Sequence, residues 1–91
     1  MSGVVRRRLV VRGVVQGVWY RDSVRRVAEQ HRVTGSAANH LDGSVEVVLE
    51  GLADAVAAVE AYCAEGPRHA HVTAVEATDE QPRGLAGFTI R

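Results

Sequence analysis

The chain has 91 residues with no Lys, a single Cys and a formal net charge of zero. This length suits one small domain, 1–91, and the single Cys excludes an intramolecular disulfide. A chain without Lys cannot contain a Walker-type phosphate loop. No apolar run reaches the length of a membrane span, so we expect a cytoplasmic protein with no membrane partner.

The first third of the chain predicts a strand, a glycine-containing loop and a helix. Residues 1–5 are expected to be a loose N-terminus, and the arginines of 6–8 a solvated entry into a strand over 9–11. Residues 13–20 form the loop. Over 22–32, one helix face is formed by Val24, Val27, Ala28 and His31, which follow the three- and four-residue spacing of a helix.

The rest of the chain predicts a hairpin, a second helix and two more strands. Residues 33–39 form a strand of small residues, and a turn leads into 44–50, where apolar and polar side chains alternate. Residues 72–78 and 88–91 form the later strands. Between the strand at 44–50 and the strand at 72–78, helical spacing returns at Leu52, Val56, Val59 and Cys63, in Ala-rich sequence that Gly66 and Pro67 end.

This order of elements predicts an α+β, ferredoxin-like βαββαβ sandwich with an additional short C-terminal strand, its two helices packed on one face of a mainly antiparallel sheet. A right-handed crossover makes the first two strands parallel, so their C-terminal ends lie at the same end of the sheet. The loop at 13–20, the start of the first helix and Asn39 are therefore expected to meet there. Because many functions use this fold, the site has to identify the function.

The segment from Gly13 to Arg21 has the composition of a phosphate site. Gly13 and Gly17 allow the backbone to curl so that several N–H groups point inward, helped by the positive end of the helix dipole. Arg21 at that helix end is electrostatically unfavourable without a nearby anion, and its planar guanidinium fits a phosphate in bidentate fashion. The alternative is an ordinary strand-to-helix loop with a solvated Arg21.

Two stretches of the chain resemble the two signatures of the acylphosphatase family. The first is Val11-x-Gly13-x-Val15-Gln16-Gly17-Val18-x-Tyr20-Arg21, and the second is Gly35-Ser36-Ala37-Ala38-Asn39-His40-Leu41-Asp42-Gly43-Ser44-Val45, followed by Gly51. The resemblance covers nearly the whole chain, with the same order of elements. It departs at Tyr20, where the family usually has Phe or Met, and at Ser36, where it usually has an aromatic residue.

The resemblance implies an enzyme that hydrolyses the carboxyl–phosphate bond of acyl phosphates without a metal or other cofactor. It implies that Asn39 orients the attacking water and that phosphate is bound by Arg21 and the loop residues Val15, Gln16, Gly17, Val18, Trp19 and Tyr20. Little machinery is needed, because the carboxylate leaves readily and phosphoryl transfer depends on positioning and charge stabilisation. The expected partner is a small acyl phosphate, bound by a monomer.

Two other functions share this order of elements. RNA-recognition domains do, and residues 1–32 hold eight Arg against two acids. The strand at 44–50, however, lacks stacking aromatics and is expected to place Glu46 and Glu50 on an open face, so we expect no nucleic-acid partner. Charge alone is equally consistent with neutralisation by residues 33–91. A catalytically silent phosphate-binding or regulatory domain is the second alternative, and turnover of an acyl phosphate distinguishes it.

Histidine and cysteine residues suggest other chemistry only weakly. His69 and His71 lie near Cys63 in sequence but lack a fourth ligand at metal-site spacing, so we expect loop or surface histidines and no metal. Cys63 falls on the apolar face of the second helix, which predicts a buried, inert thiol. His31 is expected to have a core or capping role, and His40 to occupy the turn after Asn39.

Overall fold

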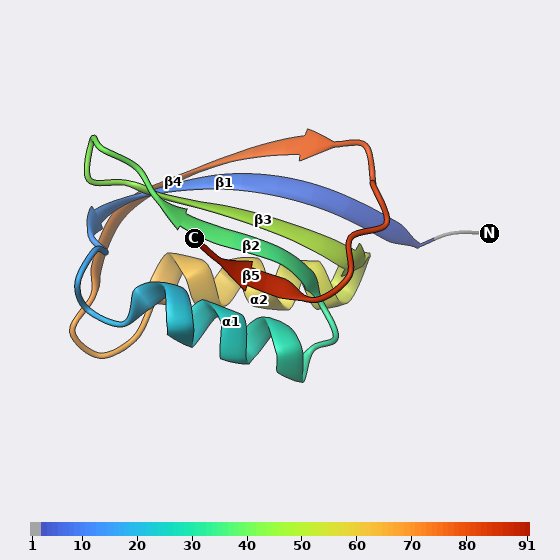
Figure 1. Cartoon of the computed structure of the whole chain (residues 1–91), viewed down its shortest axis with the longest axis horizontal. Helices are drawn as coiled ribbons and strands as arrows, with labels where there is room; N and C mark the ends of the chain where they lie inside the picture. Colours follow the sequence, from blue (N-terminus) through green and yellow to red (C-terminus); the bar gives the residue numbers. More distant parts are fainter. Residues whose placement is uncertain (1–2) are drawn as a thin grey trace.

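The computed structural model describes residues 3–91 as a five-stranded sheet with two helices packed on one face (Figure 1). The elements are β1 (Val4–Val14), α1 (Tyr20–Gln30), β2 (Thr34–Asn39), β3 (Val45–Leu52), α2 (Ala53–Glu65), β4 (His71–Glu80) and β5 (Phe88–Ile90). The predicted ferredoxin-like order, with its additional short strand, is confirmed. Within the described residues, neither helix has both the length and the apolarity needed to cross a bilayer.

The sheet brings the ends of β1 and β2 together. Its strand order is β4-β1-β3-β2-β5. β1 and β2 both pair antiparallel with β3, so they run parallel to each other as predicted, and β5 adds to β2 as a parallel neighbour. Val45 at the start of β3 lies opposite Val11 on one side and Asn39 on the other. The C-terminal ends of β1 and β2 therefore flank the same residue.

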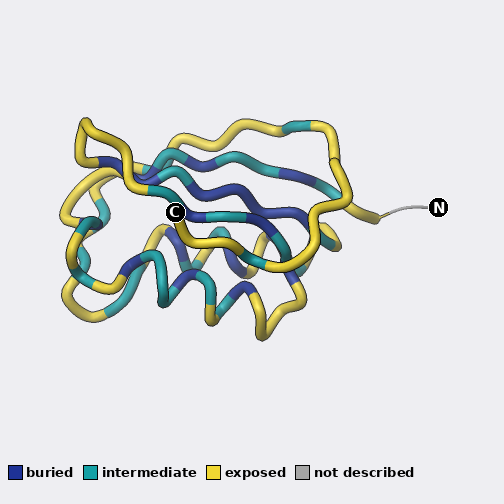
Figure 2. Tube along the Cα trace, in the orientation of Figure 1, coloured by how far each residue is buried: buried dark blue, intermediate teal, exposed yellow. Residues whose placement is uncertain are grey.

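The core lies between the sheet and the helices, whereas β4 is exposed along most of its length (Figure 2). The predicted spacings hold on the buried face of each central element: Leu9, Val11, Val45, Val47 and Leu49 from the strands, Val24 and Ala28 from α1, and Val56, Val59 and Cys63 from α2. His31 is exposed and caps α1 through its backbone N–H, which donates to the carbonyls of Val27 and Ala28. Leu52, predicted on the buried helix face, precedes α2 and is exposed.

β1 is longer than predicted because its arginines are paired across the sheet. The sequence predicts a loose segment over residues 1–5, but β1 begins at Val4; Met1 and Ser2 lie outside the described residues. The arginines of 6–8, predicted to be solvated, all form ion pairs. The partners are Glu50 and Glu80 for Arg6, Glu60 and Asp79 for Arg7, and Glu46 and Glu80 for Arg8. Much of the basic charge of the first third is thus neutralised inside the fold.

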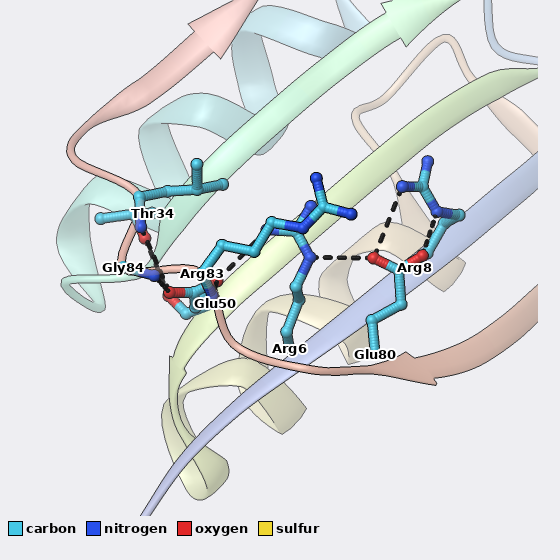
Figure 3. Close-up of polar contacts among 8 residues, drawn as sticks. Arg6, Arg8, Thr34, Glu50, Glu80, Arg83 and Gly84 are labelled. Atoms are coloured by element: carbon cyan, nitrogen blue, oxygen red, sulfur yellow. Dashed lines mark hydrogen bonds and ion pairs between the residues drawn. The ribbon is translucent and has the colours of Figure 1, made fainter.

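Glu50 holds the connection between β4 and β5 against the sheet face opposite the helices (Figure 3). Its carboxylate accepts hydrogen bonds from the N–H groups of Arg83 at 2.9 Å, Gly84 at 2.6 Å and Leu85 at 3.3 Å, and from Arg6 Nη1 at 3.2 Å. The prediction that Glu50 lies on an open face is therefore wrong, since the connection covers it. Burial raises the pKa of this carboxyl, but the N–H donors and Arg6 outweigh burial and hold the pKa below its usual value.

We expect Glu50→Gln to destabilise the fold by about 3 kcal/mol, because Arg6 stays buried with one ion pair fewer and the amide cannot accept all of the backbone N–H groups. Urea denaturation followed by circular dichroism measures the loss. Glu65→Gln removes an exposed carboxyl from α2 and is the control, expected to change stability by less than about 0.5 kcal/mol.

The destabilisation is expected to depend on pH. Folding lowers the pKa of Glu50, so its stabilisation is complete above the carboxyl's pKa in the unfolded chain and is lost as the pH falls through the folded value. The difference between Glu50→Gln and the unmodified protein should therefore shrink in acid. Equal stability of the two proteins at neutral pH would contradict the role given to Glu50.

Candidate active site

The loop between β1 and α1 presents backbone N–H groups that the rest of the described chain does not use. The N–H groups of residues 17–21 donate no hydrogen bond to any of residues 3–91. Gly17 and Trp19 have left-handed φ angles of 73° and 63°, and left-handed residues within a turn are the backbone pattern of anion-binding concavities. α1 begins directly afterwards without a side-chain cap, so the positive end of its dipole faces the loop. We call residues 17–21 the N–H cradle.

The two glycines of this segment have different roles. Gly17 has a left-handed backbone, and a Cβ added there would meet no atom within 4 Å, so the residue shapes the N–H cradle and leaves space in front of it. Gly13 instead lies in β1, at a bulge where a Cβ would approach the His71 carbonyl oxygen to 2.0 Å. The interpretation that both glycines curl the phosphate loop is therefore wrong, because Gly13 permits close pairing with β4.

Arg21 lies in the first turn of α1 and is held by the chain beyond β5. Its Nη1 donates a hydrogen bond to the backbone oxygen of Arg91, whose own N–H donates to the carbonyl of Ala37 at 2.9 Å. Ala37 lies two residues before Asn39 on β2, so these contacts fix Arg21 near the C-terminal end of that strand. Neither Nε nor Nη2 of Arg21 bonds to a described residue. The Nε–Nη2 edge of the guanidinium, whose two N–H groups point in parallel, is therefore free to bind a ligand.

A hollow of about 560 Å³ lies beside Arg21. Its lining consists of Val15, Gly17, Trp19, Tyr20, Arg21, Asp22, Arg26 and Ile90. The volume falls within the range of small-molecule sites. We call this space the Arg21 hollow.

Asn39 is the last residue of β2 and is exposed. It lies at the same end of the sheet as the loop, but it is not part of the lining of the Arg21 hollow. Gln16 connects the two regions, because its Nε2 donates to the carbonyls of His40 at 2.7 Å and Ser44 at 2.9 Å. Gln16, one of the loop residues that the resemblance implies to bind phosphate, thus uses its side chain to tie the loop to the turn that follows Asn39.

Three other loop residues contribute side chains to the core. Val15 and Tyr20 are each 1% exposed and also form part of the wall of the Arg21 hollow, while Val18 packs partly buried against the same core. The Tyr20 hydroxyl, a departure from the family pattern, donates to the Cys63 carbonyl at 2.7 Å, and burial raises its pKa. These residues therefore hold the loop in place and can reach a ligand mainly through the backbone.

The turn after Asn39 is held by its own polar groups. Asp42 accepts hydrogen bonds from the Ser44 hydroxyl at 2.6 Å and the Ser44 N–H at 2.9 Å, and these bonds, with Arg12, lower the pKa of Asp42 to about 2. His40 Nε2 lies 2.9 Å from a carboxylate oxygen of Glu46. The position of His40 in the turn agrees with its predicted role.

Cys63 is buried as predicted, and burial raises the pKa of its thiol to about 12. Across residues 3–91, no group of three or more His, Cys, Asp or Glu side chains is arranged to hold a metal ion. Because the thiolate is the reactive form, we expect iodoacetamide to modify Cys63 only when the protein unfolds. Mass spectrometry of the labelled protein, native and in denaturant, measures this; rapid labelling with loss of activity in the native state would contradict it.

A family model, curated proteins and a solved structure similar to this chain all point to one family. A model of the Acylphosphatase family matches residues 7–90, which include the N–H cradle, Arg21 and Asn39. A curated acylphosphatase from Rubrobacter xylanophilus is 48% identical over 85 residues, covering 92% of this chain and 77% of that protein. One from Pseudomonas aeruginosa is 44% identical over 81 residues, covering 89% of each. The solved structure of an acylphosphatase from Coxiella burnetii has a TM-score of 0.93 and 32% identity, covering 98% of this chain and 94% of that one.

Proposed function

The chain belongs to the acylphosphatase family of enzymes, and from this premise we propose that it hydrolyses acyl phosphates at the Arg21 hollow by direct attack of water. The observation that carries the proposal is the N–H cradle, whose unpaired donors lie beside a guanidinium with a free bidentate edge. The products are a carboxylate and inorganic phosphate. A single chain supplies the cradle, Arg21 and Asn39, so we propose a monomer acting on small acyl phosphates.

The phosphoryl group binds first by its oxygens. The N–H cradle donates to some of them, and the Nε and Nη2 groups of Arg21 donate to two others in bidentate fashion. The hydrogen bond from Nη1 to Arg91 keeps the guanidinium plane oriented before substrate arrives. Donors that are already in place stabilise the negative charge of the transition state without rearranging during the reaction.

Asn39 places the attacking water. Its amide can accept one hydrogen bond from the water and donate another, while staying neutral beside a phosphate. The water oxygen forms a bond to phosphorus as the phosphorus–oxygen bond to the acyl group breaks, and the electron pair leaves with the carboxylate. Asp22, the carboxylate in the hollow, is paired with Arg25 and Arg26, so we assign the water's proton to a phosphate oxygen.

Release of inorganic phosphate from benzoyl phosphate by the purified protein tests the proposal. We expect turnover far above the spontaneous rate, with inorganic phosphate acting as a competitive inhibitor. If the protein binds inorganic phosphate but does not hydrolyse benzoyl phosphate, the result would instead favour a catalytically silent phosphate-binding domain.

Metal independence gives a separate prediction. No step above uses a metal ion, so the rate should be unchanged in excess EDTA, measured with the same benzoyl phosphate assay. A strong loss of activity that one divalent metal restores would overturn the metal-free mechanism.

A further inference from the structure

The chain's only tryptophan is exposed beside the phosphate-binding groups. Trp19 is 80% exposed although its neighbours, Val18 and Tyr20, pack against the core. A large aromatic side chain normally contributes to stability by burying its surface, and this one leaves most of it in water. Trp19 nevertheless lines the Arg21 hollow, so a ligand there can cover the indole.

The backbone of Trp19 also favours a role in binding. It has φ 63° and ψ 21°, a left-handed conformation that is rare for a bulky residue and typical of functional sites. The fold buries only a small part of the Trp19 side chain, and the side chain does not cap α1. Packing therefore does not account for a tryptophan at this position.

The lining of the Arg21 hollow contains both polar and apolar groups. Arg21 and the N–H cradle supply the polar groups that bind the phosphoryl group in the proposed function. Among the apolar residues of the lining, Val15 and Tyr20 are buried, so Trp19 and Ile90 supply the exposed apolar side chains. The other charged groups of the lining, Asp22 and Arg26, are paired with each other at 3.0 Å and offer no unpaired charge.

We propose that Trp19 and Ile90 bind the acyl half of the substrate, so that the enzyme prefers acyl phosphates with an aromatic or other large apolar acyl group. This inference rests on the proposed function, because it concerns the same substrate. The acyl group is joined to the phosphoryl group that Arg21 holds, and a hollow of about 560 Å³ has more space than a phosphate fills. The indole face stacks on the acyl group, while the phosphate contacts stay the same for every substrate.

Substrate discrimination tests this assignment. Trp19→Ala should lower kcat/KM for benzoyl phosphate about three- to tenfold, mostly through KM, because an aromatic pair contributes that much binding. Acetyl phosphate, whose acyl group is too small to cover the indole, should change less than twofold. Trp19→Phe should retain most of the preference. The control is Leu52→Ala, which removes an exposed apolar side chain from a residue that pairs with the start of β1 and does not line the hollow. Equal losses for the two substrates would overturn the inference.

Fluorescence gives a readout independent of turnover, because all tryptophan emission comes from Trp19. Benzoylphosphonate, which cannot be hydrolysed at its carbon–phosphorus bond, should change the emission strongly, whereas saturating inorganic phosphate or acetylphosphonate should change it little. The same response to all three probes would contradict an acyl platform. A protein that responds as expected but hydrolyses neither acyl phosphate would refute the proposed function alone, and normal turnover without discrimination would refute only the acyl platform.

Discussion

Arg21→Lys is expected to remove most of the activity, a loss on the order of 10²–10³ in kcat/KM, which is the cost of losing one preorganised donor contact in the transition state. Lysine keeps the positive charge but replaces a planar fork with a flexible point charge. It can also reach either the phosphate or the backbone oxygen of Arg91, but it cannot hold both in fixed geometry as the guanidinium does. Steady-state hydrolysis of benzoyl phosphate measures the effect.

The control for this variant lies on the same helix. Arg25 is one turn further along α1, pairs with Asp22, and does not line the Arg21 hollow, so Arg25→Lys should be near neutral in activity. Arg26 is a weaker control because it lines the hollow. Urea midpoints of both variants should stay close to that of the unmodified protein, since Arg21 is outside the core. Small, equal effects at the two positions would show that Arg21 does not hold the phosphoryl group.

The sequence predicts the fold well because its signals are local. Helical spacing at Val24 and Ala28 and alternation at Val45 and Val47 each require only neighbouring residues, and all four side chains are fully buried. The N–H cradle is also a local feature, since Gly17 and the helix start lie within a few residues of each other. A chain this small has few arrangements that cover one sheet face, so local signals are sufficient for the topology.

The features that the sequence does not reveal depend on distant partners. Arg6 contacts Glu80, 74 residues away, and Glu50, 44 residues away, and nothing local distinguishes it from a solvated arginine. The contact of Arg21 with Arg91 spans 70 residues. The sequence places Gln16 in the phosphate loop, but it does not predict the bonds from the Gln16 side chain to the turn at 40–44, which form because the sheet brings the two loops together.

Trp19 is a different case, because its exposure can be inferred from the sequence through its position relative to the apolar spacing of the first helix. The helix face begins at Tyr20 and repeats at Val24, which leaves the preceding residue outside the core. An aromatic residue outside the core and next to Arg21, the arginine that we propose binds phosphate, is a feature that spacing alone could have picked out as a candidate ligand contact.

Asn39→Ala is expected to lower kcat on the order of 10²-fold, because the proposed mechanism assigns to Asn39 the orientation of the attacking water. Binding should change much less. Asn39 does not line the Arg21 hollow, so the inhibition constant of inorganic phosphate should stay within a few-fold of its original value. The fold should also be unaffected, since the Asn39 side chain forms no hydrogen bond within residues 3–91. Single-turnover hydrolysis and competitive inhibition by phosphate separate the two quantities.

Ser36→Ala provides the matched control on the same strand. Ser36 lies three residues before Asn39 and its side chain is on the opposite face of β2, so it should leave both kcat and phosphate inhibition unchanged. The decisive quantity is the division of the Asn39→Ala effect between kcat and phosphate affinity. A collapse of phosphate affinity with a preserved rate per bound substrate would make Asn39 a phosphate-binding residue. In that case another group must place the water, and His40 in the adjoining turn, 2.9 Å from Glu46, would be the first residue to test.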